Sequence, residues 1–365
     1  MASFDEVLKD CTKLGTKIPT SEYLENGKYP IIDQGQNDIA GYYDSDDGLF
    51  EDVPTIVFGD HTRVVKYVDK PCFLGADGVK LLCPVDKDIN CKYLFYQLSC
   101  ADIPNTGYNR HFKWVKALDF KIPSSDEQNH VVEVLDKVTE LISLRKQQLA
   151  KLDELVKARF VEMFGDTKLN PNNFPCCSLS EYIVFLTSGS RGWSQYFTDS
   201  GEYFITIKNV KNCKITLQDV QYVTPPDNAE AKRTRVQEND LLISITADLG
   251  RTGIVTKKIA EHGAYINQHL TCIRLKQDKL NPLYVAYYME SDAGKEQFVA
   301  KNQSAVKAGL NFNAINSLKL MVPPLALQNQ FATFVERVDQ QKQTVQQGLE
   351  KLELMKKALM QEYFG

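Results

Sequence analysis

Side chains that can hydrogen-bond bases and phosphates are concentrated in a few turns of this sequence. In the first half, the turn Gly59–Arg63 follows a short apolar run, and the stretch Tyr108–Trp114 alternates basic and aromatic residues. Hydroxyl, amide, imidazole and guanidinium groups of this kind contact nucleic-acid bases and phosphates. The candidate binding residues of the first half are therefore His61, Thr62, Arg63, Asn109, Arg110 and Lys113.

The second half offers a similar set of polar turns. A glycine-rich loop, residues 188–193, carries one arginine and one tryptophan, and amide or basic groups recur in three later segments. These residues suit the same chemistry. The candidates here are Ser190, Arg191, Trp193, Lys208, Asn209, Lys211, Arg233, Arg235, Asn267 and Gln268.

Each of these turns also has a purely structural interpretation. Asp60 could cap backbone amides within its own turn, and Tyr108–Trp114 could be the start of a helix that packs its aromatic residues. Isolated lysines and arginines are usually ordinary surface residues. The concentration of such groups in both halves favours binding.

Motifs for catalysis and for metal binding are missing from the sequence. It contains no GxxxxGK[ST] phosphate loop, no GxGxxG opening a helix, no Asn/Asp-Pro-Pro-aromatic tetrapeptide, no HExxH and no GxSxG. The nine cysteines form no CxxC pair, and the five histidines do not complete a zinc pattern. We therefore expect no catalytic residue, no metal site and no cofactor on this chain.

Length and composition indicate a cytoplasmic protein with more than one core. The chain has 365 residues, of which 43% are hydrophobic, without an apolar run long enough for a membrane span. Its first ten residues are partly acidic, unlike a secretory signal. The net charge of −4 is unevenly distributed, with −5 in residues 1–121 and +4 in residues 167–321. Local patches therefore decide whether phosphate can bind.

The chain contains an internal repeat. Residues 122–165 align without gaps on residues 322–365, with 13 identities in 44 positions. Both copies begin with a proline followed by Gln-Asn and end with Phe-Gly. Each half is therefore a variable region followed by a nearly constant one.

The constant segments are predicted to be long helices. Apolar residues recur at heptad spacing at Val131, Leu135, Val138, Ile142, Leu149, Leu152, Val156 and Met163. A helix of about 38 residues would be about 57 Å long. Each helix could pack on its own domain, but so narrow an apolar seam suits another helix better. An antiparallel coiled coil between the two copies is the favoured arrangement.

The variable segments are predicted to be mixed and mostly β. Short runs at 55–58, 79–82, 203–207, 241–245 and 270–275 are bounded by turn residues, and helical stretches follow at 92–100 and 282–301. The predicted fold class is α+β, with two tandem mixed α/β domains, separated and joined by two long helices in a pseudo-twofold repeat. The predicted boundaries are 1–121, 122–166, 167–321 and 322–365.

This organisation resembles the DNA-specificity subunits of type I restriction–modification systems. The resemblance lies in the alternation of two variable domains with two near-constant helices, and in L-x-K-L-x4-K-A-x3-E-x-F-G closing each helix. The turns at Gly59–Thr62 and Gly75–Gly78 and the loop at Ser188–Trp193 are also similar to stretches common in that family.

The resemblance implies a non-catalytic subunit that reads double-stranded DNA. Each variable domain would be a target recognition domain for one half of a bipartite, asymmetric site, and the helices would set the unread spacer. Two modification subunits would bring S-adenosylmethionine and methylate adenines, and restriction subunits would bring ATP and Mg. The alternative is a cytosolic tandem-domain scaffold or adhesion-type protein whose coiled coil binds protein partners.

Overall fold

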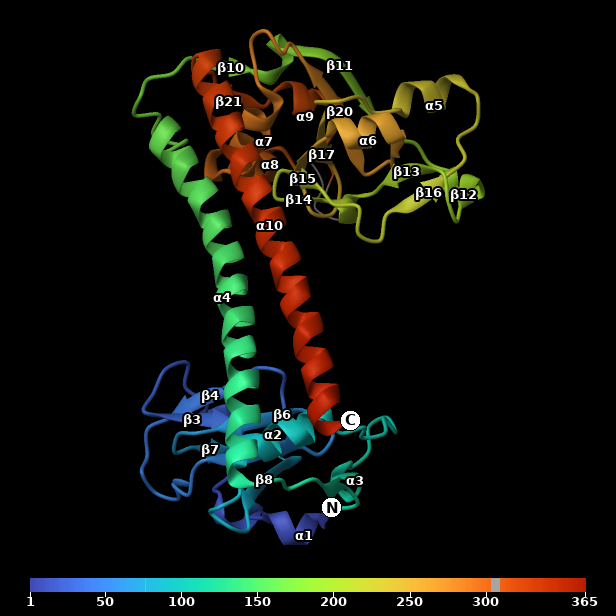
Figure 1. The fold of residues 1–365 in the computed structure, drawn as a ribbon. Helices are drawn as coiled ribbons and strands as arrows, with labels where there is room; N and C mark the ends of the chain where they lie inside the picture. Colours follow the sequence, from blue (N-terminus) through green and yellow to red (C-terminus); the bar gives the residue numbers. More distant parts are fainter. Residues whose placement is uncertain (76, 303–308) are drawn as a thin grey trace. The chain divides into compact units, whose positions relative to one another are not determined.

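The computed structural model describes residues 1–75, 77–302 and 309–365 (Figure 1). These residues form two compact units, the first made of residues 1–148 and 345–365 and the second of residues 149–344. Each unit thus contains one variable region and a part of both constant segments. The predicted α+β fold class is confirmed, and the two units are described separately.

The first unit is built on two small sheets. A four-stranded antiparallel sheet has the order β2 (Leu8–Asp10), β8 (Val79–Pro84), β5 (Thr55–Gly59) and β6 (Val65–Val68). A three-stranded sheet has the order β4 (Gly41–Tyr43), β3 (Tyr29–Ile32) and β7 (Phe73–Leu74), with β3 and β7 parallel.

Strand β5 is continuously apolar because both of its faces are buried. Alternate residues of a strand face opposite sides, and both sides of β5 are covered: Ile56 and Phe58 pack in the core around α2 (Cys91–Cys100), whereas Val57 packs in a second core. Buried on both faces, the strand needs no polar alternation.

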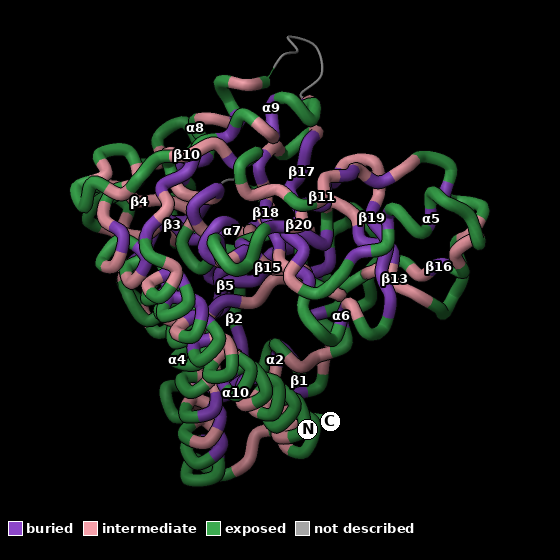
Figure 2. The backbone as a smooth tube through the Cα atoms, turned by 90° about the horizontal axis from the view of Figure 1, so that it is seen from above, coloured by how far each residue is buried: buried purple, intermediate pink, exposed green. Residues whose placement is uncertain are grey.

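The second unit repeats this plan. Its four-stranded sheet has the order β11 (Ile183–Ser188), β20 (Leu270–Leu275), β17 (Leu241–Ser244) and β18 (Thr252–Ile254). Its other main sheet has the order β12 (Phe197–Thr198), β16 (Gln221–Val223), β13 (Glu202–Ile205) and β19 (Ala264–Ile266), with β13 and β19 parallel. The predicted strand at 203–207 ends at Ile205, because a 3-10 turn begins at Ile207. Figure 2 shows the buried backbone along β5, β17 and β20.

Shorter elements complete the two units. The predicted helical stretch at 282–301 is two helices, α7 (Pro282–Glu290) and α8 (Asp292–Lys301), because the backbone of Ser291 is extended. The remaining elements are β1 (Ala2–Ser3), α1 (Phe4–Val7), η1 (Thr12–Leu14), η2 (Thr20–Glu22), α3 (Phe112–Val115), β9 (Asp119–Phe120), β10 (Cys176–Ser178), η3 (Leu179–Glu181), η4 (Trp193–Tyr196), η5 (Ile207–Asn209), β14 (Val210–Lys211), β15 (Lys214–Ile215), α5 (Ala229–Thr234), α6 (Lys257–His262), α9 (Phe312–Asn316) and β21 (Lys319–Met321).

The constant segments are long helices, as predicted. Helix α4 (Ser125–Phe164) and helix α10 (Leu325–Phe364) each have 40 residues. Ser124 and Glu127 exchange the hydrogen bonds of a capping box, which starts α4. Among the described residues, α4, α10 and the other helices all lack an apolar stretch that could span a membrane.

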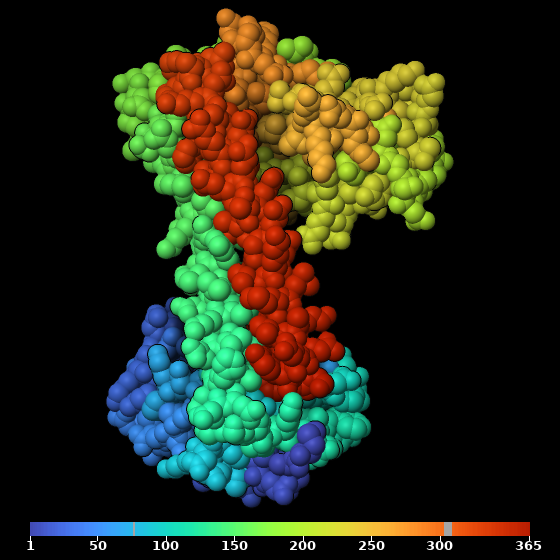
Figure 3. Space-filling model, in the orientation of Figure 1, coloured from blue at the N-terminus to red at the C-terminus, as the bar shows by residue number. Residues whose placement is uncertain are grey.

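The two helices pack antiparallel within each unit, which confirms the predicted pairing. In the first unit, Lys146 of α4 forms an ion pair with Glu353 of α10 at 3.1 Å. In the second unit, Asp153 of α4 pairs with Lys342 of α10. In both, an early part of one helix lies beside a late part of the other, and Figure 3 shows the two surfaces in green and red.

The predicted seam is incomplete at the end of α4. Met163 is partly buried against the core, as predicted, but Phe160 and Phe164, which the prediction did not include, are more deeply buried there. The buried residues depart from heptad spacing there because the last turns of α4 pack on an aromatic cluster of the second unit and not on a helix alone. The helices therefore pair with each other and also pack on the variable regions.

A glutamine and an asparagine attach the first variable region to α4. Asn90 caps α2, and its backbone N–H donates to Gln128 Oε1 at 2.9 Å while its side-chain amide donates to Asn129 Oδ1 at 2.8 Å. Gln128 Nε2 in turn donates to Pro123 O at 2.9 Å. We call this set of contacts the amide clamp.

The amide clamp is repeated in the second unit. Asn281 caps α7 and donates from its backbone to Gln328 Oε1 at 2.8 Å and from its side chain to Asn329 Oδ1 at 2.9 Å. Gln328 Nε2 donates to Pro323 O at 2.7 Å. The Pro and Gln-Asn identities of the sequence repeat therefore have a structural cause.

Candidate nucleic-acid interface

Three loops of the first unit meet at one end of its strands. Strands β3 and β7 are parallel, so their carboxyl ends lie at the same edge. Gln34, just after β3, accepts a hydrogen bond from His61 N at 3.2 Å and donates to Asp77 O at 3.0 Å. Thr62 Oγ1 donates to Gln34 O at 2.7 Å. Gln34 thus joins the loops that follow β3, β5 and β7.

Asp60 accepts a hydrogen bond from a backbone amide, as its structural interpretation predicted, but that amide belongs to Phe112 and not to its own turn. Its side chain is buried and accepts a hydrogen bond from Phe112 N at 2.7 Å. His111, also buried, donates from its backbone to Asp60 O at 2.8 Å. Asp60 therefore attaches the turn after β5 to the start of α3, while the binding role of the neighbouring His61 stays a prediction.

The outward surface of this turn carries a pair of stacked rings. The His61 and Tyr108 ring centroids are 4.7 Å apart, with the planes 8° from parallel. Tyr108 is 87% exposed. His61 Nδ1 lies 3.2 Å from Asn109 O, and Asn109 and Arg110 are exposed beside the pair. These flat and hydrogen-bonding surfaces suit stacking and edge contacts with bases.

The other candidate residues of the first half differ in whether their side chains are exposed or already bonded within the protein. Arg63 donates to Ile103 O at 3.0 Å and adopts a positive φ of 63°, so its guanidinium supports the loop. Lys113 is exposed, with its ammonium 5.2 Å from the Trp114 ring centroid. Thr62 is exposed but bonded to Gln34.

Gly78 leaves the space that this arrangement needs. A Cβ at Gly78 would lie 2.5 Å from Gln34 Nε2 and 2.7 Å from His61 Cδ2, and its φ of +87° is unfavourable for other residues. Its neighbour Ala76, part of the same predicted turn, lies outside the described residues. Glycine here keeps Gln34 and His61 in contact with the turn after β7.

The equivalent strand ends of the second unit carry a second loop cluster. Strands β13 and β19 are parallel, and Lys208 follows β13 while Asn267 and Gln268 follow β19. His269 Nδ1 lies 2.6 Å from Thr246 Oγ1, which follows β17. The duplicated sheets therefore present polar side chains at matching edges.

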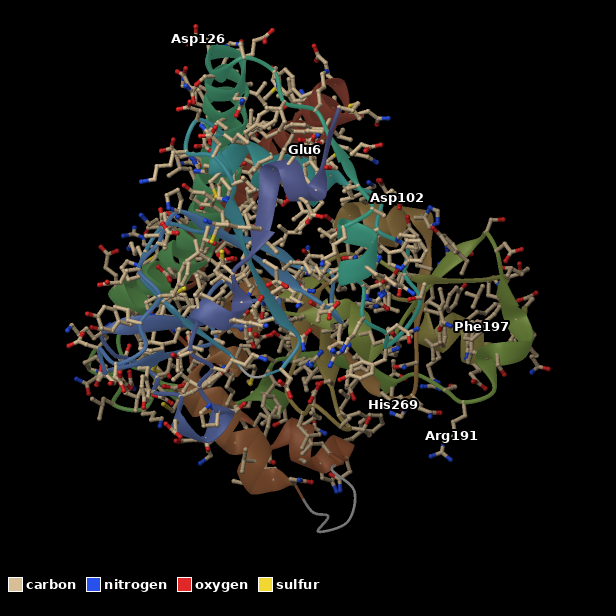
Figure 4. All side chains as sticks on the ribbon, turned by 90° about the horizontal axis from the view of Figure 1, so that it is seen from below. Glu6, Asp102, Asp126, Arg191, Phe197 and His269 are labelled. Carbon is tan, nitrogen blue, oxygen red and sulfur yellow. The ribbon has the colours of Figure 1, made fainter. Side chains whose placement is uncertain are left out.

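Arg233 holds the glycine-rich loop in place. Its guanidinium donates to Thr187, to Ser188 O at 3.0 Å and to Ser190 Oγ at 3.1 Å. Arg235 forms an ion pair with Glu202 at 3.1 Å. Both arginines are thus engaged with the protein. Arg191 is exposed at the tip of the loop, and Figure 4 shows its side chain pointing away from the ribbon.

The structure changes the interpretation of two candidates. The Trp193 side chain is only 4% exposed and packs against Phe204 and Tyr265. Asn209 is 2% exposed and donates to Thr216 O and Gln218 O. Neither side chain is placed to contact a ligand, because each fills its own domain's interior. Lys208 and Lys211, beside Asn209, are exposed.

Four residues at these loops were missed as candidates: Gln34, Tyr108, Thr246 and His269. Two of them occupied turns that the sequence had singled out, Tyr108 in the aromatic–basic stretch and His269 after Gln268. The sequence around Gln34 and Thr246 did not mark them as candidate binding residues, because their importance comes from contacts with residues far along the chain.

Two buried thiols of the first unit have a raised pKa. Burial raises the pKa of Cys72 and of Cys91 to about 12, so both thiols stay protonated at neutral pH. Among residues 1–75, 77–302 and 309–365, no three His, Cys, Asp or Glu side chains are grouped to hold a metal ion.

Comparison with known sequences places this chain in a family. The family model described as the type I restriction modification DNA specificity domain matches residues 5–154 and again residues 194–354. A putative type I restriction enzyme MjaX specificity subunit from Methanocaldococcus jannaschii is 24% identical over 95% of this chain and 86% of its own length. The type I restriction enzyme EcoR124I/EcoR124II specificity subunit of Escherichia coli is 19% identical over 91% of this chain and 84% of its own.

Solved structures share the fold. The S subunit of a type I restriction–modification system from M. genitalium covers 100% of this chain and 95% of its own, with a TM-score of 0.62 and 16% identity. A chain from a structure titled for complex assembly and conformational transition of the type I R-M system covers 98% and 94%, with a TM-score of 0.56 and 15% identity.

Proposed function

Since this chain belongs to the type I restriction–modification DNA specificity family, we propose that it reads a bipartite, asymmetric DNA site and directs adenine methylation and restriction by partner subunits. Each variable region reads one half of the site through the loops at its strand ends. The observation that carries the proposal is the duplicated loop cluster, which the same two-sheet framework presents in each unit.

The domain boundaries proposed are 1–121 and 167–321 for the two target recognition domains, and 122–166 and 322–365 for the two helical segments. The positions of α4 and α10 within the helical segments support this division. The helices act as a spacer that sets how many unread base pairs separate the half-sites.

The partners proposed are double-stranded DNA, two modification subunits and the restriction subunits. S-adenosylmethionine, ATP and Mg belong to those partners, and the chain itself acts without catalysis in the cytoplasm. The name of the EcoR124I/EcoR124II relative supports such a role. The scaffold or adhesion-type alternative is not favoured, since both family matches cover DNA-specificity domains.

The direct test of this function is methylome sequencing of a host that carries this gene with its partner genes. The expected result is adenine methylation at one motif made of two different short sequences separated by an unread spacer. Methylation of a single continuous motif, or of none while the complex is assembled, would contradict the proposal.

Exchange of residues 1–121 for the matching domain of another family member is expected to change one half of the methylated motif. The amide clamp makes this exchange feasible, because the domain needs an asparagine at the position of Asn90 to meet Gln128 and Asn129. Methylome sequencing of the chimera measures the outcome. If both halves changed, the two regions would not read DNA independently.

Replacement of Arg110 or Arg191 by alanine is expected to weaken DNA binding, because both guanidinium groups are exposed at the loop clusters. A bidentate contact to a base would cost about 1–3 kcal/mol and relax the specificity at one position. Loss of a phosphate contact would lower the affinity for all DNA sequences alike and would make that affinity less dependent on salt concentration. Fluorescence anisotropy at several salt concentrations distinguishes these cases. Arg63→Ala is the comparison, since that guanidinium faces Ile103 O.

A further inference from the structure

The first unit has an open hollow where the last turns of α10 pass the end of α2 and the middle of α4. Its volume is about 600 Å³, and apolar groups of Ile142 and Met360 line it together with Cys100. Lys146, Lys356 and Lys357 also line it, together with one acidic residue, Glu353. It is therefore an apolar depression with a basic rim.

At the matching positions of the second unit, buried side chains fill the space. Lys356 and Met360 correspond, at the offset of 200, to Val156 and Phe160. Both of these are buried. The Phe160 ring lies 5.9 Å from the ring of Tyr284 and 5.3 Å from that of Phe331. In the second unit Val156 and Phe160 therefore fill the space that Lys356 and Met360 leave open in the first unit.

The charges at the hollow are only partly neutralised. Lys146 pairs with Glu353 at 3.1 Å. The Lys356 ammonium lies 5.9 Å from the Tyr96 ring centroid, and neither it nor that of Lys357 forms an ion pair with a carboxylate of the described residues. Two cations are therefore available to an anionic group beside an apolar floor.

The surroundings of Lys356 disfavour the charged form of its side chain unless a counterion is present. Burial lowers the pKa of Lys356, and the neighbouring Lys146 lowers it further, while Asp136 opposes the shift. Asp136 is itself engaged, since it pairs with Lys92 at 2.8 Å and accepts a hydrogen bond from Tyr96 at 2.6 Å. A carboxylate arriving from outside would relieve the cost of placing Lys356 there.

We propose that this hollow receives an acidic, partly apolar segment of a modification subunit, with carboxylates at Lys356 and Lys357 and an apolar side chain over Ile142 and Met360. Charge complementarity and the apolar floor select this occupant over a free anion, which would leave the floor uncovered. At the matching positions of the second unit, Val156 and Phe160 are buried and occupy the space, so the two modification subunits bind at unequal strengths. The inference rests on the association with modification subunits proposed above.

The test is to fill the hollow with the residues of the second copy. Lys356→Val combined with Met360→Phe reproduces the closed packing of Val156 and Phe160. Lys356→Glu combined with Lys357→Glu reverses the charge while leaving the hollow open. Lys351→Glu is the control, because Lys351 is an exposed lysine of the same helix that does not border the hollow.

Each full-length variant is mixed with the modification subunit from the same host, and native mass spectrometry and calorimetry measure stoichiometry and affinity. We expect both double variants to lose roughly tenfold or more in affinity for one modification subunit, with the other unchanged and the control unaffected. Circular dichroism with urea unfolding verifies the fold of each variant.

Three results would overturn the inference. Wild-type affinities in both double variants would mean that the hollow is unoccupied, while leaving the proposed assembly intact. Equal weakening of both modification subunits would remove the asymmetry. A wild-type chain that binds no modification subunit would overturn the proposed assembly and this inference together.

Discussion

Inserting one heptad into both long helices is expected to lengthen the unread spacer of the DNA site by about three base pairs. Seven helical residues add about 10 Å, and a base pair occupies about 3.4 Å of the duplex. A whole heptad keeps the apolar seam in phase. The half-sites themselves should not change, because the loop clusters are untouched.

The insertion must be made at the same level in both helices. The middle of α4 faces the middle of α10, since a Cβ on Gly348 would lie 4.0 Å from Arg145 Nε. Insertions after Lys146 and after Gln346 therefore stay opposite each other. Methylome sequencing gives the new spacer length.

A four-residue insertion at the same two sites is the matched comparison, because it rotates the seam out of phase and should lower activity. If the heptad variant stayed active with an unchanged spacer, the helices would only brace the domains, and the modification subunits would set the spacing.

Replacing Phe164 by alanine is expected to destabilise the second unit by about 3–5 kcal/mol, the usual cost of removing a fully buried phenylalanine. The Phe164 ring is completely buried, with centroids 4.9 Å from Phe160, 4.7 Å from Tyr284 and 5.6 Å from Phe331. These neighbours are ordered by other contacts, so the space cannot close fully after truncation.

Phe364→Ala is the control that the repeat provides. Phe364 holds the matching position in α10 but is only half-buried, and it meets Tyr93 at 5.2 Å. Its replacement by alanine should lower the free energy of unfolding of the first unit by about 1–2 kcal/mol. Hydrogen exchange of α7 and α2 peptides during urea unfolding assigns each loss to its unit. Equal losses would mean that burial does not explain the roles of the two phenylalanines.

The long helices could be predicted because their determinants are local. Backbone bonds within a helix join residues four apart, so apolar spacing and proline positions reveal α4 and α10 directly from the sequence. The repeat strengthened this prediction, since both copies carry the same Gln-Asn, although their clamp on Asn90 and Asn281 was not visible.

The strands were found for a similar reason. Runs such as Thr55–Phe58 and Leu241–Ile245 are apolar, rich in β-branched residues and bounded by turns. Their order in the sheets, and the shared plan of the two variable regions, depended on pairings such as β5 with β8 and β17 with β20 that span many residues.

The arrangement of the loops was decided by tertiary structure alone. The sequence by itself determined which residue types gather in the turns, but it could not distinguish an exposed Arg191 from a buried Trp193 two residues later. It also could not reveal Gln34, which meets Asp77 at a separation of 43 residues. The physical reason is that a loop side chain is oriented by long-range packing and hydrogen bonds, whereas a helix carries its pattern within each turn.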